Sequence, residues 1–193
     1  MAVFGIPFAH EDDPDRAVRA AIAMMKGIRE FNERRKRGGK TEIVHGIGLN
    51  TDQIVSGNIG SPKRMDYTVI GDGVNLAARL ESASKQYGAS ILMSEFTHQS
   101  LKGTYRMREI DRVIVKGKTQ AVGIYEVLDY HDENSYPQIR KALPLFADGY
   151  ASYQTGAFEN AIDLFNAVLA VNPHDKAAEI YIERCQQLIK TPP

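Results

Sequence analysis

An asparagine and an arginine four residues apart are the side chains of this sequence best suited to hold a phosphate group. Asn75 and Arg79 lie in a segment with helical spacing, so they share one face of that helix. Arginine offers a rigid fork of donors to phosphate oxygens, and a nearby helix N-terminus adds its own dipole. The pair therefore predicts binding of phosphate charge. Spacing alone favours a plainer alternative, an amphipathic helix whose Asn and Arg face water.

Two elements have to position this pair. Aromatic and β-branched residues predict a strand over residues 67–70, which Gly71 ends. Asp72 is then expected to cap a helix over residues 74–87 that stops at Gly88. The apolar residues that would bury the opposite side of this helix are Val74, Leu76, Ala77 and Leu80.

The whole stretch around the pair closely resembles the signature of the class III nucleotide cyclases, the family of adenylate and guanylate cyclases. The similar segments are Asp-Tyr-Thr-Val-Ile-Gly-Asp at residues 66–72, Val-Asn-Leu-Ala-Ala-Arg-Leu-Glu at 74–81, Val-Lys-Gly-Lys at 115–118 and Val-Gly-Ile-Tyr-Glu-Val at 122–127. The opening Met-Ala-Val-Phe-Gly-Ile-Pro is similar to the family's central strand and the following turn. The resemblance covers residues 1 to about 129, in order, and is far more specific than a lone glycine motif.

The resemblance implies a reaction and a role for four residues. In the family, the 3′-hydroxyl of a nucleotide attacks its α-phosphorus and pyrophosphate leaves. By position, Asn75 would orient the ribose and Arg79 would bind the α-phosphate as charge builds there. Lys118, with Lys116 as the alternative, is similar to the lysine that binds the terminal phosphates. Thr68 stands at the base-selecting position, where threonine is typical of a bacterial subgroup of adenylate cyclases.

That subgroup makes ATP the expected substrate, with cyclic AMP and pyrophosphate as products. A hydroxyl both donates and accepts hydrogen bonds, so Thr68 alone does not dictate adenine. A guanylate cyclase therefore stays open as an alternative.

The family's metal ligands are the main departure. The family uses two Mg²⁺ or Mn²⁺ ions held by two aspartates that precede the strand similar to residues 1–5. The acidic residues Asp12, Asp13 and Asp15 instead indicate a helix start, with Asp13 as cap and Pro14 in the first turn. No metal ligand is assigned, and the ligands are expected upstream of this chain or from a partner subunit.

Without those aspartates, little or no cyclase activity is expected from this polypeptide alone. Active sites of the family lie at a dimer interface, so a metal-competent mate could complement the chain, and a homodimer through the cyclase domain is expected. The rival hypothesis is a non-catalytic regulatory or docking module derived from a cyclase.

The elements predict an α/β (α+β) fold, a ferredoxin-like cyclase sandwich lacking its first strand and helices. Strands are expected at residues 1–5, 43–49, 54–59, 67–70, 91–93, 105–115 and 122–128. Helices are expected at residues 14–37 and 74–87, with a short one after a cap at Ser94. In the family, the hairpin formed by residues 54–70 contributes to the dimer contact.

The pattern changes to helix alone near the C-terminus. Residues 1–129 are predicted as the cyclase domain, 130–139 as a linker, and 140–190 as a tetratricopeptide-like repeat with a capping helix. Gly149 and Ala161 would let two helices approach, and Pro173 would end the second helix. An ordinary helical hairpin is the alternative. One repeat buries its faces poorly, so it should lean on the cyclase domain, a dimer mate or a partner protein.

Composition narrows the class of protein. Lys+Arg 24 balances Asp+Glu 24, which argues against nucleic acid as a partner. The single cysteine, Cys185, excludes an internal disulfide and fits a reducing compartment. No run of residues is apolar enough for a membrane span, and a cytoplasmic location is expected.

Overall fold

A four-stranded sheet lies at the centre of the chain. The structure is a computed structural model that describes residues 1–61, 64–114 and 121–191. Within them, the strands of this sheet run in the order β1 (Ile47–Leu49), β4 (Ile91–Ser94), β6 (Ala121–Val127) and β5 (Met107–Ile114). β1 and β4 are parallel, and the other neighbours are antiparallel.

Helices cover both faces of the sheet because its strands alternate apolar residues between them. On one face, Ile91 and Met93 belong to the same buried cluster as Val18 of helix α1 (Asp13–Arg37). On the other face, Leu92 belongs to the cluster that contains Leu80 of helix α2 (Asp72–Tyr87). α2 packs directly against β1 and β4.

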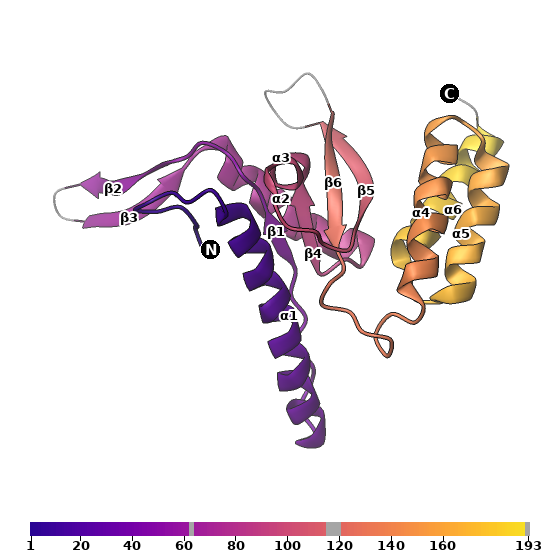
Figure 1. Cartoon of the computed structure of the whole chain (residues 1–193), viewed down its shortest axis with the longest axis horizontal. Helices are drawn as coiled ribbons and strands as arrows, with labels where there is room; N and C mark the ends of the chain where they lie inside the picture. The colour runs from indigo at the N-terminus through magenta and orange to yellow at the C-terminus, as the bar shows by residue number, and fades with distance from the viewer. Residues whose placement is uncertain (62–63, 115–120, 192–193) are drawn as a thin grey trace.

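The predicted hairpin is present as a separate two-stranded sheet. β2 (Val55–Ser61) pairs antiparallel with β3 (Arg64–Ile70). Figure 1 shows the two strands extending away from the central sheet. Val55, Tyr67 and Ile70 are exposed there, so the hairpin presents apolar surface outward.

Three helices follow the sheet and pack side by side next to β5 (Figure 1). They are α4 (Ile139–Gln154), α5 (Phe158–Val171) and α6 (Lys176–Lys190). Their core is aromatic: the rings of Phe165 and Tyr181 stack with centroids 5.2 Å apart. The helical hairpin and a third helix are therefore as expected, and the tetratricopeptide assignment stays a prediction.

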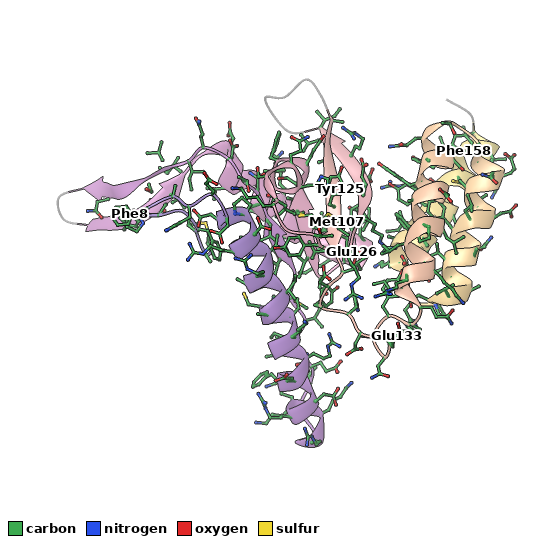
Figure 2. The ribbon with its side chains drawn as sticks, viewed as in Figure 1. Phe8, Met107, Tyr125, Glu126, Glu133 and Phe158 are labelled. Atoms are coloured by element: carbon green, nitrogen blue, oxygen red, sulfur yellow. The ribbon has the colours of Figure 1, made fainter. Side chains whose placement is uncertain are left out.

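The helical part packs against the sheet. The predicted cyclase domain is thus the one of the three expected supports that the structure shows in contact with it. Side chains fill the space between β5 and α4 (Figure 2). Ile110 of β5 and Phe146 of α4 are fully buried in one continuous cluster that also contains Leu80 of α2. The sheet and the helical segment thus share a hydrophobic core.

The segment predicted as a linker is packed rather than free. Tyr130 and Tyr136 are buried, and the guanidinium of Arg29 in α1 binds the Asp132 carboxylate at 2.6 Å and the backbone carbonyl of Tyr130. The beginning of this segment is therefore anchored to α1.

Two strand predictions differ from the structure. Residues 1–5 form no strand, because a strand needs a hydrogen-bonded neighbour and none of the described strands pairs with them. The strand predicted from residue 43 begins only at Ile47, where pairing with Ile91 starts.

Two predicted caps are also wrong. Asp12, not Asp13, occupies the N-cap of α1, and the Asp13 carboxylate accepts the backbone N–H of His10 at 2.7 Å. Gly71, not Asp72, occupies the N-cap of α2. The Ser94 cap is confirmed, since its Oγ accepts the N–H of Thr97 in the short helix α3 (Glu95–Ser100).

In the described ranges, no helix combines the length and the apolar character that crossing a bilayer requires.

Candidate functional site

Asn75 and Arg79 lie on the exposed face of α2. Leu76 and Leu80 of the same helix are buried against the sheet, so the pair faces away from the core. In the part of the chain that the structure describes, neither side chain has a hydrogen-bond or ion-pair partner. Several other arginines are paired, as Arg106 is with Asp129 at 3.1 Å. No described residue therefore occupies the donors of the α2 pair.

The start of α2 is set by its backbone and by one side chain. Gly71 has φ 156°, a conformation that a residue with a Cβ rarely adopts, so the strand can turn directly into the helix. Asn50, which follows β1, donates from Nδ2 to the carbonyl of Gly73 at 3.0 Å. Asn50 Oδ1 in turn accepts the hydroxyl of Ser94 at 2.6 Å. These bonds hold the first turn of α2 over the ends of β1 and β4.

Sequence reasoning missed Asn50. The available signal was a polar residue directly after a predicted strand, where side chains of parallel strands gather at one edge of a sheet.

Thr68 lies on β3, the strand that leads into α2. It is half-buried and sits opposite Gly57 of β2. Thr68 and the α2 pair therefore belong to one strand–turn–helix unit, although no hydrogen bond among the described residues joins their side chains. Lys118 and the alternative Lys116 fall between β5 and β6, outside the described residues.

The acidic residues at the start of α1 do not fit a metal site. The Asp15 carboxylate accepts the N–H groups of Lys102 at 3.0 Å and Gly103 at 2.8 Å, and the hydroxyl of Tyr105 at 2.9 Å. Burial opposes ionisation of Asp15, but these donors outweigh it and lower its pKa. Asp15 therefore ties α1 to the segment before β5. Across the described ranges, no three His, Cys, Asp or Glu side chains are grouped as metal ligands, and no catalytic step is assigned to a metal on this chain.

A buried ion cluster joins the sheet to the helical part. Arg108 of β5 donates to Glu126 of β6 at 2.7 Å, and through both terminal nitrogens to Asp175 at 2.6 and 3.1 Å. Tyr136 donates to the same Asp175 carboxylate at 2.5 Å, and the Arg108 guanidinium lies 4.2 Å from the centre of the Phe146 ring.

The charges of this cluster depend on one another. Burial opposes ionisation of Asp175, but Arg108 outweighs it and lowers the pKa of this carboxyl. Burial raises the pKa of Glu126, and Arg108 offsets only part of that effect. Asp175 also caps α6 by accepting the N–H of Ala178 at 3.1 Å.

Comparison with known proteins places these features in a family. A family model described as the adenylate and guanylate cyclase catalytic domain matches residues 1–128. A terminal-differentiation-specific adenylate cyclase of Dictyostelium discoideum is 38% identical over 179 residues, 91% of this chain and 8% of that protein. An adenylate cyclase of Anabaena cylindrica is 42% identical over 124 residues, 61% of this chain and 25% of that protein.

A solved structure supports the same family. The crystal structure of the adenylyl cyclase CyaB from P. aeruginosa aligns with a TM-score of 0.57 at 37% identity, covering 65% of each chain. The chain spans only a small part of the two curated relatives. Because 91% of it matches the Dictyostelium protein, that similarity extends past residue 128 into the helical part. On these grounds, the chain belongs to the family of adenylate and guanylate cyclase catalytic domains.

Proposed function

We propose that this chain supplies the transition-state half of an adenylate cyclase active site, which converts ATP to cyclic AMP and pyrophosphate. The observation that carries the proposal is the exposed pair of Asn75 and Arg79 on the helix that follows β3, a pair that has no hydrogen-bond or ion-pair partner among the described residues. Two adenylate cyclases among the relatives favour ATP. In this proposal, Thr68 contacts the base.

The proposed chemistry needs the pair to act on different parts of the nucleotide. The 3′-hydroxyl loses its proton to water as its oxygen forms a bond to the α-phosphorus. The bond from that phosphorus to the bridging oxygen breaks, and pyrophosphate departs. Arg79 donates to the α-phosphate oxygens, where negative charge grows in the transition state. Asn75 hydrogen-bonds the ribose and directs its 3′-hydroxyl at the phosphorus.

Metal ligands would come from a partner subunit, because the acids near Asp15 are engaged in the fold. The exposed apolar residues Val55, Tyr67 and Ile70 of the hairpin support a second copy or a homologous cyclase as that partner. Mg²⁺ or Mn²⁺ held there would neutralise phosphate charge.

Complementation tests this proposal. The chain is mixed with a full-length homologous cyclase that keeps its metal aspartates but lacks its own Asn/Arg pair, and cyclic AMP is measured with Mn²⁺ and ATP. Cyclic AMP is expected from the mixture and not from either component alone. Arg79→Ala should lower this rate by about 10²–10³. The control is Lys85→Ala, which removes an exposed cation from the same helix and should leave the rate unchanged.

Either of two results would overturn the assignment. Full turnover by the Arg79→Ala mixture would remove Arg79 from the site. A mixture that forms cyclic GMP from GTP faster than cyclic AMP from ATP would replace ATP with GTP as the substrate.

A regulatory or docking module is the second candidate. The observation that favours it is the engagement of the acids at the start of α1, which leaves this chain without a metal site among its described residues. A folded chain that binds the partner cyclase but yields no cyclic nucleotide in the mixture would support this candidate over the first.

A further inference from the structure

We infer that Arg184 of α6 and Asp111 of β5 are positioning residues for the proposed cyclase reaction, because they hold Tyr87, the last residue of the helix that carries Asn75 and Arg79. The inference rests on the proposed function and extends it to the helical part of the chain. In this inference, the helical part of the chain fixes the position of α2, the helix proposed to carry the active-site pair.

The contacts form a closed cluster of three side chains. The hydroxyl of Tyr87 donates to the Asp111 carboxylate at 2.5 Å, and Arg184 donates to the same oxygen at 2.8 Å. A second nitrogen of Arg184 lies 3.5 Å from the Tyr87 hydroxyl. Burial, followed by the bond to Asp111, raises the pKa of Tyr87 to about 12, so it remains a neutral donor at physiological pH.

A β-bulge directs Asp111 toward this cluster. Glu109 pairs with Tyr125 and Asp111 with Ile124, so Ile110 is an extra residue in β5. The Ile110 carbonyl accepts the hydroxyl of Tyr181 from α6 at 2.7 Å. Side chains one turn apart on α6, Tyr181 and Arg184, therefore both contact the bulge.

α6 is held against β5 at a second place as well. Asp175 at its start binds Arg108, which lies three residues before Asp111 on β5. The end of α2 also abuts α6: Gly88 has φ 65°, and a Cβ built on it would lie 2.9 Å from Cβ of Lys176. The end of α2 is thus fixed by a helix that is itself fixed at two points.

The cluster lies away from the residues that are proposed to bind the nucleotide. Tyr87 follows Arg79 by eight residues, about 12 Å along the helix axis. A shift of α2 would therefore move Asn75 and Arg79 without removing any group that binds the nucleotide. A misplacement of about 1 Å at a reacting centre can cost about 10² in rate.

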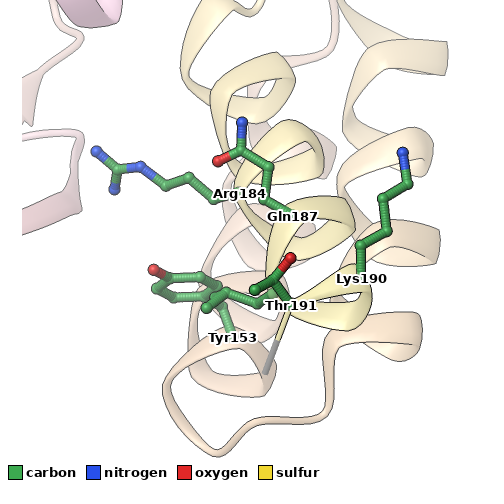
Figure 3. A pocket seen from close by; sticks show the side chains of 6 residues that line it. Tyr153, Arg184, Gln187, Lys190 and Thr191 are labelled. Carbon is green, nitrogen blue, oxygen red and sulfur yellow. The ribbon is translucent and has the colours of Figure 1, made fainter. Parts of the chain in front are cut away.

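The test uses the complementation assay with two variants of this chain. Tyr87→Phe removes the hydroxyl and keeps the packed ring, and Arg184→Gln removes the charge. For both, kcat should fall about 5- to 10-fold while KM for ATP stays unchanged. Lys190→Gln is the matched control. Figure 3 shows Arg184 extending from α6 toward the neighbouring ribbon, whereas Lys190 of the same open hollow points away from it.

Amide hydrogen exchange gives a second readout that needs no turnover. In both variants, amides in the last two turns of α2 should exchange faster than in the parent chain, while amides of α1 remain unchanged. Unchanged kcat and unchanged exchange in α2 would overturn the inference. Faster exchange throughout α1 and α2 would also overturn it, because the cluster would then support the whole fold rather than one helix.

The two proposals fail in different ways. If the parent mixture forms no cyclic nucleotide, the proposed function fails, and selective exchange in α2 alone decides whether the cluster positions this helix. If Arg79→Ala abolishes turnover while Tyr87→Phe and Arg184→Gln keep full kcat, the proposed function stands and the positioning role is wrong.

Discussion

Arg79 differs in its surroundings from the arginines that are held in ion pairs. Arg108 is buried between two carboxylates, and Arg106 is paired with Asp129. Arg79 is exposed, shares its helix face with Asn75, and has no partner among the described residues. An arginine left without a carboxylate keeps its donors available for phosphate, which is the property that the proposed reaction requires.

Asn75→Ala should affect turnover more than substrate binding. The amide is proposed to direct the ribose hydroxyl, so its loss should lower kcat by about 10²–10³ with little change in KM for ATP. Steady-state kinetics of the complemented mixture measure both constants. Ser82→Ala, an exposed change farther along α2, is the control. A higher KM with unchanged kcat would show that Asn75 only binds substrate.

His131 should make stability depend on pH. Burial, followed by the nearby Arg29, lowers the pKa of His131 from 6.5 to about 4. As the pH falls from 6.5 to 4, the unfolded chain binds a proton that the folded chain does not, so the free energy of unfolding falls. Thermal unfolding between pH 7.5 and 4.5 measures this loss. His131→Gln should flatten the slope, and an equal slope in both proteins would contradict the assignment.

At the scale of elements, ion pairs connect β5 of the sheet to α6 of the helical part. Arg108 and Asp111 lie on β5, and Asp175 and Arg184 lie at the start and in the middle of α6. The strand thus contacts α6 through two ion pairs, one fully buried and one partly exposed. A helix held at two points cannot swing about either of them.

Asp175→Asn should destabilise the fold strongly. The change removes one of the two carboxylates that compensate the buried Arg108. Breaking a buried pair costs about 3–5 kcal/mol. Urea unfolding followed by circular dichroism measures the loss. Arg19→Met, which removes an exposed ion pair with Asp12, is the control and should leave the unfolding midpoint nearly unchanged. A midpoint shift no larger than that of the control would show that the cluster adds little.

For the whole molecule, the sheet of the cyclase domain and the helical part share one hydrophobic core. Leu80, Ile110, Phe146 and Tyr181 come from four different elements and are all at most 1% exposed in one cluster. Separating the parts would expose the face of the sheet that carries Ile110. The helical part therefore completes the hydrophobic core of the described sheet.

Shortening the chain to residues 1–137 should consequently abolish cooperative unfolding. The shortened chain would expose apolar surface now covered by α4 and α6, and it should bind a hydrophobic dye and aggregate. Calorimetry and dye fluorescence measure these effects. A shortened chain with a sharp transition at the parent's temperature would show that the helical part is an independent domain.

The sequence by itself determined the local features of this protein. The strand–Gly71–helix unit, the end of α2 at Gly88, the hairpin and the Ser94 cap depend on residues close in sequence, so their types and spacing specify them. The same string of residues carried the resemblance to the cyclases. The positions of Asn75 and Arg79 on one exposed helix face follow from helical periodicity alone.

Only the tertiary structure decided the features that depend on pairing between residues far apart in the sequence. The strand predicted at residues 1–5 does not form, because a strand exists only with a neighbour to pair with. Arg108 meets Asp175 across 67 residues and Asp111 meets Arg184 across 73, and no local pattern marks those partners. Charged residues in a sequence are ordinarily expected at the surface, and only the packing of the helical part against β5 places Arg108 and Asp175 in the core. The contacts that hold the end of α2 are therefore a property of the fold.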